Sequence, residues 1–121
     1  MTTKILLVED EDPLRGAIAK TLRERGYEVD EACDGEEGLE RIKAAKGGYA
    51  LVICDVAMPV LDGLAMLKAA GKGLGSARVL LMSGYEVDQS LADFKGRTVH
   101  ALKKPIAHAQ VADEAGALLA A

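Results

Sequence analysis

The stretch Ala50-Leu51-Val52-Ile53-Cys54-Asp55 decides the fold, because it is the most uniformly apolar run of the 121-residue chain and ends abruptly in a carboxylate. Five apolar residues in a row are typical of a strand that is covered on both faces, as the central strand of a parallel sheet is. We therefore expect a buried strand over Ala50–Cys54. Asp55 is expected to open the following loop and to protrude from it.

Four further strand patterns surround this one, of which Tyr27–Ala32 alternates between apolar and polar residues, and helical patterns separate them. Strands are predicted at Ile5–Val8, Tyr27–Ala32, Val79–Met82 and Thr98–Leu102. Helices are predicted from Asp12-Pro13 to Gly26, from Asp34-Gly35 to about Lys46, from Asp62 through Leu64 and Leu67, over Val87–Phe94, and after Pro105 with Val111, Ala112, Ala115, Leu118 and Leu119 inward. Asp12 and Asp62 are the expected N-caps, Pro13 takes the first helical position, and Gly71–Gly75 is expected to be a connector.

Five strands that alternate with five helices predict one α/β domain over residues 1–121, with a doubly wound parallel sheet. Right-handed crossovers favour the flavodoxin-like (βα)5 fold with strand order 2-1-3-4-5. In such a sheet, ligands bind beyond the carboxyl ends of the strands, where the first and third strands lie side by side. Reactive side chains are therefore expected where the strands stop.

Composition narrows the class of protein. Half of the residues are apolar, 28% are charged and the formal net charge is −4, which favours a globular protein and argues against a broad nucleic-acid-binding face. No segment approaches the ~20 consecutive apolar residues of a membrane helix, and the first residues lack a secretory pattern. Cys33 and Cys54 match no metal or redox spacing. We expect a cytoplasmic protein with reduced thiols.

Chemically complementary residues follow four of the predicted strands. Glu9-Asp10 follows the first strand, Asp55 the third, Ser83 the fourth and Lys103-Lys104-Pro105 the fifth. Carboxylates gathered at one edge repel one another unless a cation joins them, and Mg²⁺ prefers oxygen ligands. A carboxylate such as Asp55 can form an acyl phosphate, while the Ser83 hydroxyl and the Lys104 ammonium can contact phosphate oxygens.

Each of these residues taken alone has a simpler interpretation. Asp55 fits a turn or a helix cap, Glu9-Asp10 fits the solvated start of a helix, Ser83-Gly84 fits a turn, and Lys104 fits the protein surface. Their joint arrival at one edge of the sheet is what favours a phosphoryl-accepting site.

Four segments that contain these residues resemble the conserved motifs of a known family. The segments are Ile5-Leu6-Leu7-Val8-Glu9-Asp10, Asp55-Val56-Ala57-Met58-Pro59-Val60-Leu61-Asp62-Gly63, Leu81-Met82-Ser83-Gly84 and Lys104-Pro105. In order and spacing they are similar to the receiver domain of two-component response regulators, along the whole chain.

The resemblance implies transfer of phosphate from a histidine kinase or a histidine phosphotransfer protein to Asp55. It also implies that Asp10, Asp55 and the backbone carbonyl of Ala57 bind Mg²⁺, with Glu9 acting through water. Ser83 would turn towards the phosphoryl group and Lys104 would pair with it. The chain would be a phosphoacceptor that assists its own phosphorylation and dephosphorylation, not an enzyme.

The sequence departs from the family pattern at a few positions. Receivers commonly carry a switching aromatic three residues before the Lys of Lys-Pro, and this chain has Ala101 there. Tyr85, two residues after Ser83, is the candidate to take over that role or to shield the acyl phosphate; simple packing over the loop is the competing interpretation. Glu9 stands where Asp is commoner, and Ile106 replaces the usual Phe, which leaves less packing between the last strand and helix.

No output domain is expected, so function should be carried by binding a downstream protein. The expected face combines the helix over Val87–Phe94, the fifth strand and the last helix, with Val87, Leu91, Ala101 and His108. His100 and His108 are interpreted as surface residues, and no nucleic-acid or membrane partner is expected. The chain is similar to free-standing receivers and to those of hybrid kinases. A pseudo-receiver that never carries phosphate, and a receiver excised from a larger regulator or hybrid kinase, stay open as alternatives.

Overall fold

The computed structural model describes residues 2–58, 60–84 and 97–120. Its strands are β1 (Lys4–Val8), β2 (Glu28–Ala32), β3 (Leu51–Asp55), β4 (Arg78–Ser83) and β5 (Val99–Lys103). Its helices are α1 (Asp12–Glu24), α2 (Gly35–Ala45), α3 (Gly63–Ala70), the 3-10 helix η1 (Gly71–Leu74) and α4 (His108–Ala120). The helix predicted over Val87–Phe94 lies outside the described residues.

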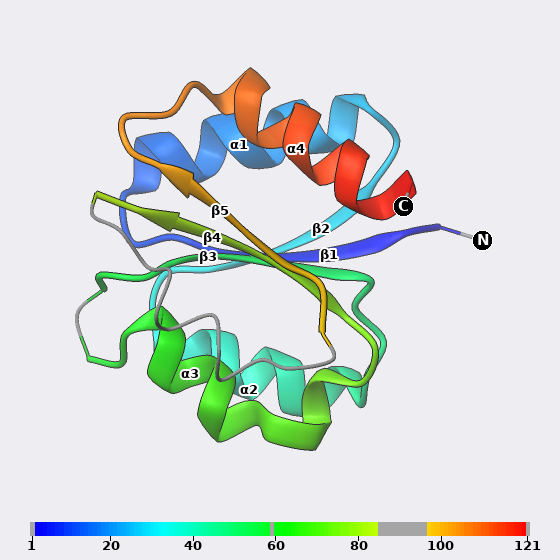
Figure 1. The fold of residues 1–121 in the computed structure, drawn as a ribbon, viewed down its shortest axis with the longest axis vertical. Coiled ribbons are helices and arrows are strands. Elements are labelled where there is room, and N and C mark those ends of the chain that lie inside the picture. Colours follow the sequence, from blue (N-terminus) through cyan, green and yellow to red (C-terminus); the bar gives the residue numbers. More distant parts are fainter. Residues whose placement is uncertain (1, 59, 85–96, 121) are drawn as a thin grey trace.

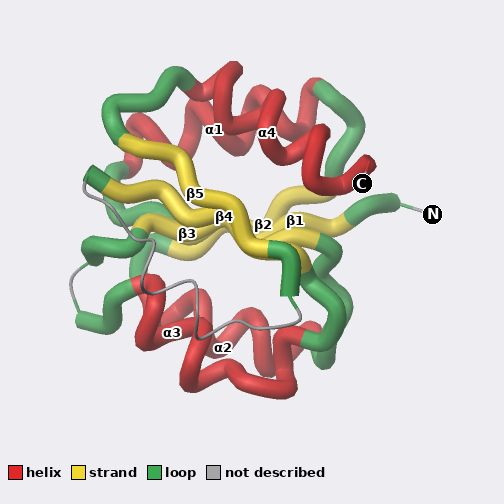
Figure 2. The backbone as a smooth tube through the Cα atoms, in the orientation of Figure 1, coloured by secondary structure: helices red, strands yellow, loops and turns green. Residues whose placement is uncertain are grey.

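The five strands form one parallel sheet with the order β2-β1-β3-β4-β5, as predicted. Figure 1 shows α1 and α4 on one face of this sheet and α2 and α3 on the other. The same three layers are visible in the backbone trace of Figure 2. The chain therefore has the flavodoxin-like architecture, in which the first and third strands lie next to each other at the centre.

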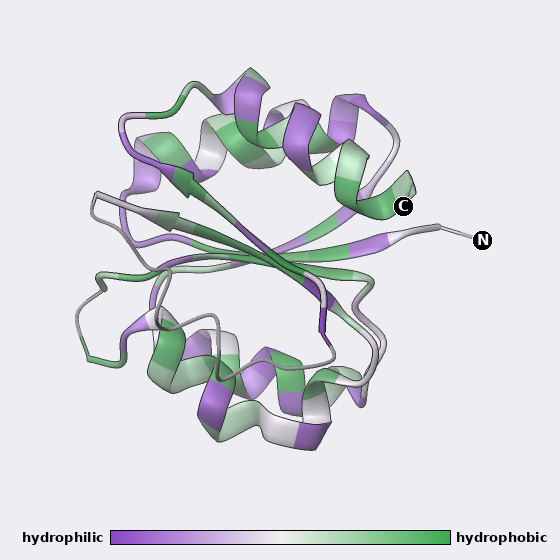
Figure 3. Cartoon of the chain, in the orientation of Figure 1, coloured by the Kyte–Doolittle hydropathy of each residue, from purple (hydrophilic) through white to green (hydrophobic). Residues whose placement is uncertain are grey.

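The core is divided into two parts by the sheet. All five residues of β3 are buried, because helices cover both of its faces. Alternate side chains of the strands enter opposite clusters: Leu6 and Val8 pack towards α2 and α3, whereas Ile5 and Leu7 pack towards α1 and α4. Figure 3 shows the apolar colour concentrated on the strands and on the helix faces that meet them.

Two helix starts differ in how they are capped. Asp62 caps α3 as predicted, since its side chain accepts a hydrogen bond from the Ala65 amide at 2.8 Å. The prediction for Asp12 was wrong. Glu11 is the N-cap of α1 and makes no side-chain cap bond, and Asp12 already belongs to the helix. Its carboxylate instead binds Arg15, one turn further on.

The Gly-rich connector is more regular than expected, because Gly71–Leu74 forms a turn of 3-10 helix. None of the helices in the described part of the chain is long and apolar enough to cross a membrane.

Candidate functional site

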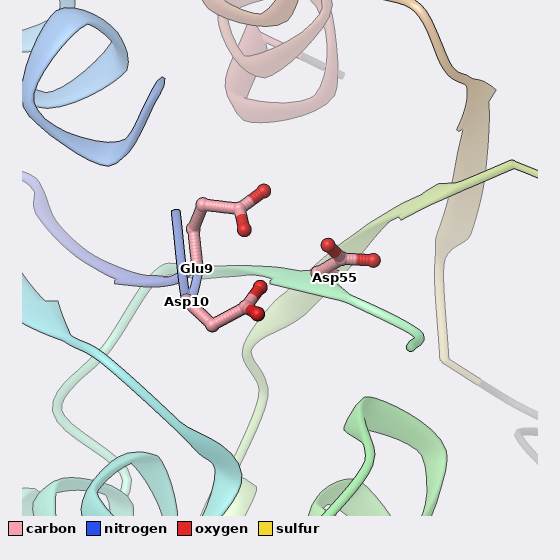
Figure 4. Close-up of side chains that lie close together, drawn as sticks. All are labelled: Glu9, Asp10 and Asp55. Atoms are coloured by element: carbon pink, nitrogen blue, oxygen red, sulfur yellow. The ribbon is translucent and has the colours of Figure 1, made fainter. Parts of the chain in front are cut away.

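Three carboxylates meet at the carboxyl edge of the sheet, where β1 and β3 end. Glu9 and Asp10 directly follow β1, and Asp55 is the last residue of β3. The register aligns Val8 with Cys54, so the two strand ends are neighbours. One carboxylate oxygen from each of Glu9, Asp10 and Asp55 lies within 4.8 Å of the others. Figure 4 shows the three side chains close together at this edge. The predicted convergence is confirmed.

Asp55 is held inside the edge and does not protrude. The residue is only 4% exposed, and the ladder continues past it, since the Val56 amide donates to the Met82 carbonyl at 2.9 Å. Its Oδ1 accepts a hydrogen bond from the Ala57 amide at 3.2 Å. The expectation of a protruding nucleophile was wrong, because Asp55 is a buried residue of β3 and its carboxylate is bonded to the Ala57 amide that follows.

Lys104 joins two of the carboxylates. Its Nζ lies 2.6 Å from Asp55 Oδ2 and 3.0 Å from Glu9 Oε1. The Lys104 amide also donates to the Ser83 carbonyl at 2.7 Å, which fixes the loop after β5 against the end of β4. Burial disfavours the ammonium charge, but the bonds to Asp55 and Glu9 outweigh it and raise the pKa of Lys104. The lysine is therefore a permanent cation at the site.

Glu9 is fully buried, which is unusual for a carboxylate. Its Oε2 accepts a hydrogen bond from the Glu11 amide at 3.1 Å. Burial raises the pKa of Glu9 from 4.5 to about 7, against the opposing effects of the Glu11 amide and the Lys104 ammonium. Glu9 is thus poised between its neutral and ionised forms near neutral pH.

Of the other residues singled out from the sequence, the structure describes Ser83, Ala57 and Ala101. Ser83 is the last residue of β4 and is 1% exposed, so it lies at the same edge. Ala57 is exposed and adjacent to Asp55, and its carbonyl as a metal ligand stays a prediction. Tyr85 lies outside the described residues. Ala101 is an exposed residue of β5, in register with Leu81.

A family comparison identifies this arrangement. The model of the response regulator receiver domain matches residues 5–115. The chain belongs to the receiver-domain family. It is 39% identical to the sensor kinase CckA of Brucella abortus over 84 residues, which is 69% of this chain and 9% of CckA. It is 36% identical to the chemotaxis protein CheY of Treponema pallidum over 81 residues, 66% of this chain and 56% of CheY.

A solved structure gives the same result for the fold. The receiver domain of the hybrid histidine kinase CckA superposes with a TM-score of 0.82 at 44% identity, covering 96% of this chain and 98% of that one. The chain spans well under two thirds of the curated relatives it matches, 9% of CckA and 37% of the transcriptional activator PfeR of Pseudomonas aeruginosa. Receiver domains of two-component response regulators, those of hybrid kinases included, are thus its relatives.

The donor set of this receiver domain suits a hard divalent cation. Receiver domains generally bind Mg²⁺ at an acidic pocket, and the three clustered carboxylates supply oxygen ligands of the kind that Mg²⁺ prefers. Asp10 is exposed, which leaves one side of the cluster open to water. Mg²⁺ commonly retains several water ligands, so a half-open cluster of this kind fits it.

Sequence reasoning missed one residue of this receiver domain that touches the site. The Arg15 Nη1 donates a hydrogen bond to the backbone carbonyl of Glu9 at 2.8 Å, from the first turn and a half of α1. The only signal was its spacing from Asp12, which allows an i,i+3 ion pair but does not reveal a backbone contact.

A cavity of about 470 Å³ opens beside Lys104, between α1 and α4. Ile18, Met82 and Val111 line its apolar part, and Ile106 borders it. Both histidines are exposed, as expected for surface residues. The Nδ1 of His100 lies 2.6 Å from Glu114 Oε1, and that of His108 lies 2.8 Å from Thr21 Oγ1.

Proposed function

We propose that this receiver domain accepts a phosphoryl group on Asp55 from a phosphohistidine of a histidine kinase or phosphotransfer protein. The observation that carries the proposal is the contact of 2.6 Å between Lys104 Nζ and Asp55 Oδ2 beside two further carboxylates. A buried carboxylate with a fixed ammonium and a cation site beside it is the arrangement that phosphoryl transfer needs, since that reaction depends on positioning and on charge stabilisation.

The reaction exchanges one bond to phosphorus for another. A carboxylate oxygen of Asp55 attacks phosphorus, the phosphorus–nitrogen bond of the phosphohistidine breaks, and its electron pair stays on the imidazole nitrogen of the donor. Lys104 is placed to hold a phosphoryl oxygen, and the hydroxyl of Ser83 comes from the end of the neighbouring strand. Hydrolysis of the acyl phosphate later returns Asp55 to its carboxylate, so the chain acts as a phosphoacceptor and not as a turnover enzyme.

Asp10, Asp55 and the Ala57 carbonyl would hold Mg²⁺, with Glu9 acting through water. The bound ion supplies positive charge to the phosphoryl oxygens. The chain's own contribution is to keep the carboxylates within one small space and to balance them with Lys104.

Phosphorylation is proposed to change binding to a downstream protein in the cytoplasm, through the face that includes β5 and α4. The added phosphoryl group carries a charge of about −1.5 to −2 at neutral pH, which biases an existing equilibrium between two conformations. Tyr85 is the candidate switch residue, because Ala101 occupies the position where receivers commonly carry the switching aromatic. We expect Tyr85→Ala to change the lifetime of the aspartyl phosphate or the affinity for the partner. If both quantities match the wild type, Tyr85 has no such role.

Intact-mass analysis tests the phosphoacceptor role. Purified protein incubated with acetyl phosphate and Mg²⁺ is expected to gain one phosphoryl group, and the gain should disappear in EDTA and in Asp55→Ala. The relevant control is Asp62→Ala, which removes a carboxylate from the same loop but only uncaps α3, and which should still gain the group.

Two results would count against the proposal. A wild-type protein without any mass gain, also with a phosphorylated histidine phosphotransfer protein as donor, would identify a pseudo-receiver. A gain that persists in Asp55→Ala would place the phosphate on another residue.

A further inference from the structure

We propose that Arg15 is a positioning residue of the cation site, which holds the turn after β1 in its binding geometry. The inference rests on the proposed function, because it concerns the affinity of that site for Mg²⁺. Arg15 contacts no carboxylate oxygen of Glu9, Asp10 or Asp55 in the structure. It acts on the backbone that carries two of them, through the bond of 2.8 Å from its Nη1 to the Glu9 carbonyl.

The guanidinium is held in a fixed orientation by carboxylates from two different elements. Its Nη2 lies 2.6 Å from Asp12 Oδ1 on α1, and its Nε lies 3.4 Å from Glu31 Oε1 on β2. The side chain is only 17% exposed. Because two edges of this planar group are engaged by carboxylates, its Nη1 is held in a fixed position from which it donates to the Glu9 carbonyl.

The turn needs such support because its helix end supplies little. Glu11, the N-cap of α1, makes no side-chain cap bond. On the strand side, the Glu9 amide donates to the Ala32 carbonyl at 3.1 Å. With Arg15 bonded to the Glu9 carbonyl, both polar groups of this residue's backbone are held. The peptide that leads to Asp10 is thereby oriented, and with it the direction of the Asp10 side chain.

A purely electrostatic role for Arg15 predicts the opposite result. A guanidinium near a cation site repels the cation, so its neutralisation would strengthen Mg²⁺ binding if charge were its main effect. A positioning role predicts weaker binding whether the charge is kept or lost. Arg15→Lys keeps the charge and the aliphatic stem but loses the rigid fork of donors, whereas Arg15→Gln loses both.

Arg23 offers a matched control on the same helix. Its Nη2 lies 3.1 Å from Glu31 Oε2 and donates to the Val29 carbonyl at 2.9 Å. Arg23 therefore shares the Glu31 partner of Arg15 and also binds a backbone carbonyl, but it does not contact the turn after β1. Arg23→Gln reproduces the loss of an α1–β2 ion pair without touching the cation site.

The experiment is a Mg²⁺ titration followed by backbone NMR shifts, with thermal unfolding and the Glu9 carbonyl carbon shift recorded without the ion. Arg15→Lys and Arg15→Gln are each expected to weaken Mg²⁺ binding by about tenfold, in the range found for residues that orient metal ligands. The Glu9 carbonyl shift should change in both variants. Arg23→Gln should lower the unfolding temperature without changing Mg²⁺ affinity.

The outcomes separate this inference from the proposed function. Wild-type protein that binds Mg²⁺ while Arg15→Lys binds it equally well, or Arg15→Gln more tightly, overturns the positioning role alone. A loss of affinity in Arg23→Gln as large as in Arg15→Lys also overturns it, since general loosening of α1 would then explain the effect. If the wild-type protein binds no Mg²⁺, the cation site itself is contradicted, and with it both the proposed function and the role of Arg15.

Discussion

Replacement of Lys104 by Met is expected to lower the free energy of unfolding by about 3 kcal/mol at neutral pH in the absence of Mg²⁺, as the breaking of a buried ion pair does. The Glu9 and Asp55 side chains are 0% and 6% exposed, and Lys104 is the cation that contacts both. Met fills a similar volume, so the loss isolates the charge. Urea unfolding in EDTA measures it.

The size of this loss should depend on pH in a defined direction. Burial raises the pKa of Glu9 from 4.5 to about 7, so the neutral form is favoured in the folded state. The corresponding stability is complete below pH 4.5 and disappears as the pH rises through 7. Without Lys104, one opposing influence on that pKa is gone, and ionisation of Glu9 becomes more costly still. The part of the difference between Lys104→Met and wild type that comes from Glu9 should therefore be small in acid and grow as the pH rises through 7 and above.

Mg²⁺ should also reduce the difference, because it replaces the missing positive charge. Lys43→Met, on an exposed position of α2, is the charge-matched control and should show neither dependence. An equal loss at acidic and neutral pH, with and without Mg²⁺, would contradict this account and indicate that Lys104 acts by packing.

Replacement of Gly63 by Ala is expected to destabilise the domain by about 3 kcal/mol and to impair phosphorylation of Asp55, since added volume in a closely packed site forces the backbone to move. Gly63 is the first residue of α3 and is buried against β3. A Cβ at this position would overlap the backbone carbonyl of Asp55 and lie 3.2 Å from Cys54 Sγ. The displaced atom would belong to the phosphoacceptor residue, so stability and reactivity should fall together. Chemical denaturation and the rate of phosphorylation by acetyl phosphate measure the two effects.

Gly16→Ala is the matched control for this prediction. Gly16 lies on an exposed position of α1, and an added Cβ there would meet no atom within 4 Å. Because Ala is the better helix former by about 1 kcal/mol, this variant should be as stable as the wild type or more so. Equal behaviour of the two Ala variants would show that the close approach of α3 to β3 is not required.

The fold and the convergence of the site residues followed from the sequence because both depend on strong patterns. Continuous apolar runs such as Ala50–Cys54 mark buried strands, and the parallel order places all their carboxyl ends at one edge. Glu9, Asp55 and Lys104 could therefore be placed together before any contact was known. Their order and spacing along the chain match those of the receiver-domain family, which left few alternative interpretations of the site.

The details that could not be predicted depend on single contacts. Whether Asp55 ends the strand or opens the loop is decided by one ladder bond, from Val56 to Met82. The role of Arg15 depends on where one long side chain finds an acceptor. Val60 has a φ of 71° although it is β-branched and 74% exposed, and no local preference predicts that conformation. Such features are set by tertiary contacts and not by periodicity.

The division of the core by the sheet has a consequence for how a signal could spread. Side chains alternate along a strand, so Asp55 continues the row that faces α1 and α4, and Ser83 continues the row that faces α2 and α3. Lys104 approaches Asp55 from the first of these sides. A phosphoryl group on Asp55 would be contacted by the Lys104 ammonium from the side of α1 and α4 and by the Ser83 hydroxyl from the side of α2 and α3. A single chemical event would then act on both of the apolar clusters into which the sheet divides the described part of the core.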